Sequence, residues 1–184
     1  MFRIQREQIK ITIWQNISIC IIALLVLSCN SVGPQRPTQR KGRDVEPDSA
    51  TLALMEFNHR LALAADEQLL QIVQSLPENY ALYEGGAWVN VLEKGDTLTE
   101  GPQLGKDCGV RMRVFNLNEQ LLIDTEGTWN IGHLELPYAV DRNIPEWNHH
   151  SRVKMYVPWY SAYGLKGTED VPPYENVIIE LEIQ

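Results

Sequence analysis

The chain has 184 residues, of which 44% are hydrophobic, and a formal net charge of −8 at neutral pH. A chain of this length has room for one domain with an adequate core and some additional segments, which argues against a multi-domain enzyme. Its acidic balance is a poor match for nucleic acid or for anionic lipid headgroups, so we expect no nucleic-acid partner.

The first 28 residues have the pattern of a secretory signal. Three basic residues precede the apolar run ISICIIALLVLSC, which is too short to span a bilayer comfortably and ends at Cys29. Its end, LVLSC, resembles a bacterial lipobox, in which the cysteine is lipidated and becomes the first residue of the mature protein. We therefore expect a lipoprotein signal peptide over residues 1–28 and lipidation of Cys29. The alternative is an uncleaved anchor helix that starts near Ile9.

The segment after the signal predicts where the protein resides. Asn30 follows the cysteine and no acidic cluster comes after it, which by resemblance to lipoprotein sorting rules indicates an outer-membrane lipoprotein of the bacterial cell envelope that faces the periplasm. Residues 29–48 combine the lipidated cysteine with a polar, proline-containing stretch that is typical of a flexible tether. Loss of residues 1–28 removes three basic residues and one acidic residue, so the mature charge is about −10. Membrane attachment is therefore expected through the lipid.

Residues 49–76 predict one long helical extension. Apolar residues recur at near-helical spacing from Leu54 to Leu76, Asp48 or Ser49 can cap the start, and Pro77 ends the pattern. Such a helix is long for a small domain. It either projects and packs against a second copy or a partner in an envelope complex, or it packs on its own domain.

Short runs with two-residue periodicity follow and predict the strands AWVNVLE, GVRMRVFN, RVKMYVP and ENVIIELEI. In VRMRVF, the apolar residues Val110, Met112 and Val114 share one face, and the two arginines between them share the other. A sheet with one face packed against a core and the other face exposed to solvent is typical of antiparallel strands. Only Cys108 would remain in the mature domain, where a lone strand cysteine is typically a small buried hydrophobe.

The sequence lacks the motifs of nucleophilic and metal chemistry. It contains no H-E-x-x-H, G-x-S-x-G, C-x-x-C or phosphate-binding glycine loop. His149 and His150 are adjacent on an expected loop, but no carboxylate or cysteine stands near them at the spacing of a metal site. The carboxylates are scattered and show no pairing for acid/base work. We therefore expect no metal and no cofactor.

The closing segment carries the one specific resemblance. It reads V-P-x-x-x-A-Y-G, then a short loop, then V-P-P-x-x-x-V-I-I-E-L-E-I, and it resembles the last two strands and connecting loop of the FKBP-type peptidyl-prolyl cis/trans isomerases. The resemblance extends upstream through VLEKGDTLTEG and LLIDT and covers about residues 89–183. It implies an α+β domain over residues 80–184, in which a twisted antiparallel β-sheet wraps on a short helix, preceded here by the long N-terminal helix.

The same resemblance implies a proline-binding site. Tyr163 of AYG corresponds to the tyrosine whose hydroxyl reaches the bound peptide carbonyl, and Asp124 corresponds to the aspartate at the pocket edge. The substrate-binding residues that it implies are Met112, Ile123, Val171, Ile179 and Tyr138. The alternative is that Tyr163 and Ile179 are ordinary loop and core residues.

The chain departs from the family where aromatic pocket walls are usual. Met112 stands where most active members carry a tyrosine, Ile123 and Ile179 replace aromatic residues, and the pocket floor falls on Ala139 or Val140. These changes predict a pocket that is shallower, reshaped or closed.

Three functional hypotheses follow. The first is a prolyl isomerase with weakened or altered activity that helps proline-containing polypeptide clients to fold in the cell envelope. The second is a non-catalytic FKBP-like chaperone or binding subunit of an envelope complex. The third is an unrelated small β-fold with a coincidental ending. Whether the protein is an enzyme is thus open at this point.

Overall fold

The computed structural model describes residues 48–98 and 100–184. The expected signal peptide, the lipidation site Cys29 and nearly all of the expected tether lie outside these residues.

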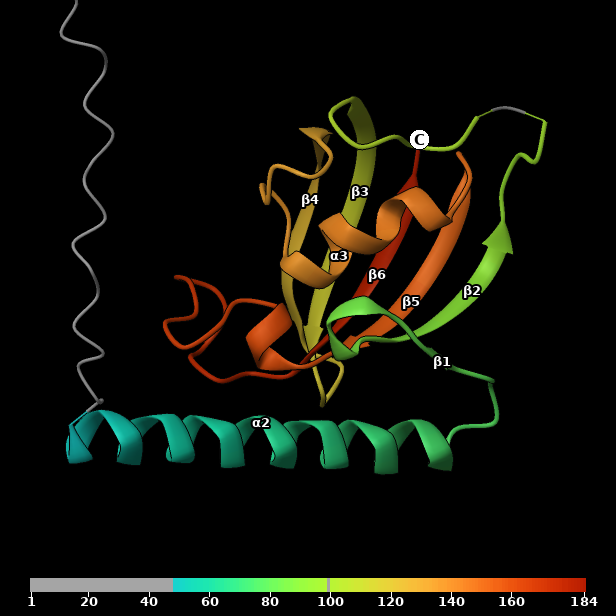
Figure 1. Ribbon diagram of the computed structural model, residues 1–184. Helices are drawn as coiled ribbons and strands as arrows, with labels where there is room; N and C mark the ends of the chain where they lie inside the picture. The colour runs from blue at the N-terminus through green and yellow to red at the C-terminus, as the bar shows by residue number, and fades with distance from the viewer. Residues whose placement is uncertain (1–47, 99) are drawn as a thin grey trace, which may run out of the picture. The chain divides into compact units, whose positions relative to one another are not determined.

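The described chain begins with one long helix and continues into a domain of short strands and helical turns (Figure 1). The elements in chain order are α2 (Ser49–Ser75), β1 (Ala81–Leu82), η1 (Glu84–Gly86, a 3-10 turn), β2 (Trp88–Lys94), β3 (Asp107–Asn116), β4 (Leu121–Asn130), α3 (Tyr138–Asn143), η2 (Ile144–Glu146, a 3-10 turn), β5 (Ser151–Val157), η3 (Trp159–Ser161, a 3-10 turn) and β6 (Val177–Ile183).

The six strands form one sheet in the order β1-β2-β5-β6-β3-β4, and every neighbouring pair is antiparallel. The four strands expected from alternation correspond to β2, β3, β5 and β6. The alternation did not single out β4, which is an edge strand with an exposed residue at almost every second position. The α+β class, with an antiparallel sheet, a short helix and a long N-terminal helix, is confirmed.

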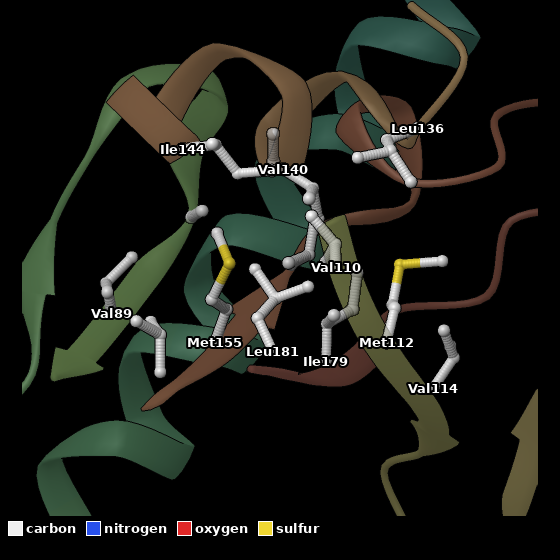
Figure 2. Packing of buried hydrophobic residues seen from close by; sticks show 14 of the residues in the cluster. Val89, Val110, Met112, Val114, Leu136, Val140, Ile144, Met155, Ile179 and Leu181 are labelled. Carbon is white, nitrogen blue, oxygen red and sulfur yellow. The ribbon is translucent and has the colours of Figure 1, made fainter. Parts of the chain in front are cut away.

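The main core lies between α3 and one face of the sheet (Figure 2). Val110, Met112 and Val114 project from β3 into this core, as their alternation predicted, while Arg111 and Arg113 lie on the other face. Cys108 is also buried on the core face, and burial raises the pKa of its thiol. The period-two pattern of the central strands therefore selects the face that α3 covers.

The two halves of α2 have different surroundings. The Asp48 carboxylate accepts a hydrogen bond from the Thr51 backbone N–H at 2.7 Å and so caps the start of the helix. In the C-terminal half, Leu69 and Val73 are buried against Tyr156 and Ile178, on the sheet face opposite α3.

The part of α2 that precedes Ala65 leaves large apolar side chains between 47% and 61% exposed, and these are Leu52, Leu54, Met55, Phe57 and Leu63. Of the two arrangements expected for the helix, the C-terminal half thus packs on the chain's own domain, and the N-terminal half projects from it. Among the described residues, no helix has the length and apolar character needed to cross a membrane.

Candidate functional site

Backbone hydrogen bonds give the loop between β5 and β6, residues 158–176, a defined shape. The N–H of Gly164 donates to the Trp159 carbonyl at 2.8 Å, and the N–H of Tyr174 donates to the Gly164 carbonyl at 3.2 Å. Farther out, Gly167 has a φ of +64°, and a Cβ there would lie 2.2 Å from the Val171 carbonyl oxygen. Only glycine fits this turn without strain. The loop is therefore a defined structure rather than a loose connection.

Tyr163 lies on this loop and packs against the main core. Its hydroxyl oxygen is buried and has no hydrogen-bond partner among the described residues. Burial, with a smaller contribution from the charge of Asp170, raises the pKa of the Tyr163 phenol to about 12. The phenol is therefore protonated at neutral pH, where it can donate one hydrogen bond.

Four of the expected apolar residues gather in the same cluster as Tyr163. Met112, Val171 and Ile179 are 5%, 1% and 0% exposed, and Ile123 packs partly buried against them. The strand register explains the grouping, because Ile123 on β4 and Ile179 on β6 both pair with Val114 of β3. Directly paired residues project from the same face of an antiparallel sheet. The sheet thus brings these walls together from three strands.

Asp124 is not part of this group, which corrects the role expected for it. It pairs with Arg113 in the strand register, and its carboxylate accepts a hydrogen bond from Arg111 at 3.4 Å. Both arginines lie on the sheet face opposite the core. Asp124 is therefore a surface ion-pair residue on the far side of the sheet from Tyr163, and it cannot form the polar edge of a site beside that tyrosine.

Tyr138 also lies outside the buried group. It stands at the start of α3 with its side chain exposed, and its hydroxyl donates to the Glu84 carboxylate at 2.8 Å. Arg142 donates to the same carboxylate oxygen at 3.0 Å. These two hydrogen bonds lower the pKa of Glu84. Tyr138 therefore joins α3 to η1 instead of lining an apolar pocket.

The floor positions on α3 are filled by small and medium apolar side chains. Ala139 and Val140 are fully buried in the main core. The helix is held there by Asp141, whose buried carboxylate accepts the backbone N–H groups of Gly132 at 3.0 Å and Leu134 at 3.2 Å. Because the walls and floor are nearly inaccessible, a proline ring can enter this cluster only after side chains move.

Two aromatic residues that the sequence analysis did not single out, Tyr83 and Trp129, pack partly buried against the same cluster. Trp129 pairs with Cys108 and so projects from the core face of β4. The alternation of Ile123, Thr125, Gly127 and Trp129 would have revealed it, had β4 been recognised as a strand.

The arrangement suits the binding of an apolar group that stands next to a hydrogen-bond acceptor. It also suits a reaction that changes only the conformation of the bound group. It combines one protonated phenol with aliphatic and aromatic walls in a rigid frame. Over residues 48–98 and 100–184, no group of three His, Cys, Asp or Glu side chains is placed to hold a metal ion.

Comparison with solved structures identifies the fold. A peptidyl-prolyl cis-trans isomerase from Pseudomonas syringae pv. tomato superposes with a TM-score of 0.55 at 16% identity, over 67% of this chain and 92% of the other. The N-terminal domain of FKBP42 from Arabidopsis thaliana gives a TM-score of 0.51 at 18% identity, over 59% of this chain and 92% of the other. No model of a protein family matches the sequence, and no curated protein matches it either. The fold is FKBP-like, as the closing motif indicated.

Proposed function

We propose that this protein is an FKBP-type peptidyl-prolyl cis/trans isomerase of weak activity that assists protein folding in the bacterial cell envelope. The observation that carries the proposal is the buried hydroxyl of Tyr163, which has no hydrogen-bond partner among the described residues and stands beside an apolar cluster. Its clients are polypeptides that contain proline.

The reaction needs no nucleophile. An X-Pro bond isomerises slowly because the amide must lose its resonance, against a barrier of about 18 to 20 kcal/mol. An apolar site that removes water from the imide, together with a donor that binds the twisted carbonyl better than the planar one, lowers that barrier. Tyr163 supplies the donor, and Met112, Ile123, Val171 and Ile179 supply the apolar surface once the site opens.

A refolding assay tests this proposal. The full chain in detergent is added to a protein whose refolding is limited by proline isomerisation, and to a panel of peptides with different residues before proline. We expect a measurable acceleration that falls at least tenfold in Tyr163→Phe, while Tyr138→Phe, which alters an exposed hydroxyl, retains it. No acceleration on any substrate would remove the isomerase proposal.

A second function is favoured by the closed walls. Because Met112, Val171 and Ile179 are at most 5% exposed, the domain would serve equally as a non-catalytic binding subunit of an envelope complex. The exposed apolar half of α2 then supplies the contact with a second copy or with another envelope protein. Isolation from solubilised envelopes should yield a stoichiometric partner that is lost in a Leu54→Glu/Phe57→Glu variant. If no partner is found, the isomerase remains the better proposal.

The localisation of the protein is a proposal that rests on the sequence alone. A lipid on Cys29 would hold the domain at the outer membrane, on its periplasmic side. Mass spectrometry of the N-terminal peptide should detect a diacylglyceryl group, and Cys29→Ser should release the protein from the membrane fraction. An unprocessed N-terminus in the wild type would favour an anchor helix instead.

A further inference from the structure

Two side chains of α2 make hydrogen bonds to the loop that carries Tyr163. The first is Asp66, whose carboxylate accepts the hydroxyl of Tyr160 at 2.5 Å. Tyr160 belongs to η3, at the start of the loop, three residues before Tyr163. Burial and this carboxylate raise the pKa of the Tyr160 phenol, so the donor is retained at any physiological pH.

The second contact reaches both ends of the loop at once. Asn176, which is 7% exposed, donates its side-chain N–H to the Gln68 side-chain oxygen at 2.9 Å. Its own side-chain oxygen accepts the backbone N–H of Trp159 at 2.9 Å. Trp159 follows β5 and Asn176 precedes β6, so this amide closes the base of the loop and fastens it to the helix.

The helix is a firm support for these contacts. Asp66, Leu69 and Val73 follow one another at spacings of three and four residues, so they share a helix face. Leu69 and Val73 are buried against the sheet, which fixes the position of this half of α2 over the sheet and its rotation about its own axis. Asp66 and Gln68 therefore meet the loop from an anchored position.

We propose that α2 is part of the loop site, with Asp66 and Gln68 as positioning residues that hold residues 158–176 in the conformation that buries the Tyr163 hydroxyl. The helix then does more than space the domain from its tether, because a partner that displaces α2 would also loosen the loop. Any effect on catalysis rests on the proposed isomerase function, whereas the effect on loop order does not.

Amide hydrogen exchange in the full chain in detergent tests the proposal directly. The reporters are the amides of Gly164, which donates to the Trp159 carbonyl within the first arm of the loop, and of Tyr174, which donates to the Gly164 carbonyl and joins the two arms. We expect exchange roughly 5- to 10-fold faster in Asp66→Ala and in Gln68→Ala, and faster still in the double variant. Amides of β3 should keep their wild-type rates.

Matched controls come from the same helix. Glu67→Ala and Gln71→Ala remove exposed side chains next to the two contacts and should leave the loop amides within twofold of wild type. Asp66→Asn keeps an acceptor oxygen and should restore most of the protection that Asp66→Ala loses. Unchanged loop exchange in the double variant would overturn the proposal, and so would equal acceleration in β3, because α2 would then only support the domain as a whole.

Isomerase assays on the same variants separate this inference from the proposed function. If the wild type is active, both alanine variants should lose at least threefold in kcat/KM, and Asp66→Asn should restore most of the wild-type kcat/KM. Wild-type activity in variants whose loop amides exchange faster would overturn the link to the site. If the wild type is inactive, the isomerase proposal fails, and the exchange results still decide whether α2 orders the loop.

Discussion

Replacement of Tyr163 by phenylalanine should make the free protein more stable, which is unusual for a substitution in a core. The ring stays in place, while a hydroxyl that is buried without a partner among the described residues is removed. An unsatisfied buried polar group costs about 1 to 3 kcal/mol of desolvation. Since Tyr163 as a whole is only partly buried, we expect a gain toward the lower end, about 1 kcal/mol.

Tyr160→Phe is the matched control, because it makes the same chemical change three residues earlier in the same loop. Its hydroxyl donates to the Asp66 carboxylate, so its removal should destabilise the protein by about 1 kcal/mol at this half-exposed position. The two tyrosine variants are therefore expected to shift stability in opposite directions.

Urea unfolding followed by circular dichroism measures both free energies, and 1 kcal/mol in a domain of this size should also move Tm by about 3 to 6 °C. Loss of 1 kcal/mol or more in Tyr163→Phe would refute the reasoning, because the hydroxyl would then have a partner in the folded protein. If the same variant is more stable but less active as an isomerase, the hydroxyl is used in the reaction and not in folding.

Three further outcomes are expected. Asp141→Ala leaves the amides of Gly132 and Leu134 without their acceptor and should lower the free energy of unfolding, measured in urea, by about 3 kcal/mol. Asp141→Asn should lower it by roughly half as much, and a loss below 1 kcal/mol in Asp141→Ala would contradict the role of this carboxylate. Leu69→Ala should cost about 2 to 4 kcal/mol because Leu69 is fully buried between α2 and the sheet, whereas Leu63→Ala, at an exposed position of the same helix, should change stability by less than about 0.5 kcal/mol. Equal effects would mean that α2 is not docked. Burial raises the pKa of Tyr163 to about 12, above the value near 10 of an unfolded tyrosine, so ionisation favours the unfolded state and the wild type loses stability as the pH rises from about 10 toward 12. Unfolding free energies at pH 9, 10 and 11 should therefore fall less steeply in Tyr163→Phe than in the wild type, and parallel curves would count against the raised pKa.

The sequence was sufficient for the elements whose signals are local. Asp48 and Pro77 bracket α2, and the strict alternation in β3 assigned its buried face correctly. β4 was harder because its core-facing positions include Thr125 and Gly127, which lack the apolar contrast that an alternating pattern needs. An edge strand that is only partly covered has little reason to show that contrast.

The site was predictable where it depends on which face of a strand a residue occupies. It was less predictable where it depends on contacts between residues that are far apart in the sequence. Met112 and Ile179 fall on core-facing positions of central strands, so their grouping follows from a period of two. Asp124 was misassigned because neighbouring residues of a strand face opposite sides of the sheet: Ile123 faces the core, so Asp124 pairs with Arg113 on the other face. Tyr138 was misplaced for another reason, since its partner Glu84 lies 54 residues away in the sequence.

The buried hydroxyl and the closed walls together indicate how the two proposed functions can be separated. A module that only binds through its surface gains nothing from an unpaired buried phenol on the loop, because phenylalanine would fill the same space without the desolvation cost. A site that is closed when empty binds its ligand only through a minor open state, which lowers the apparent affinity by the population of that state. An opening cost of roughly 3 kcal/mol would raise KM about a hundredfold while leaving kcat for bound substrate unchanged. A weak isomerase of this kind should therefore show a linear dependence of rate on substrate concentration across the accessible range. Ile179→Ala, which makes room in the cluster, should lower KM even as it lowers stability. A non-catalytic module would show the loss of stability alone.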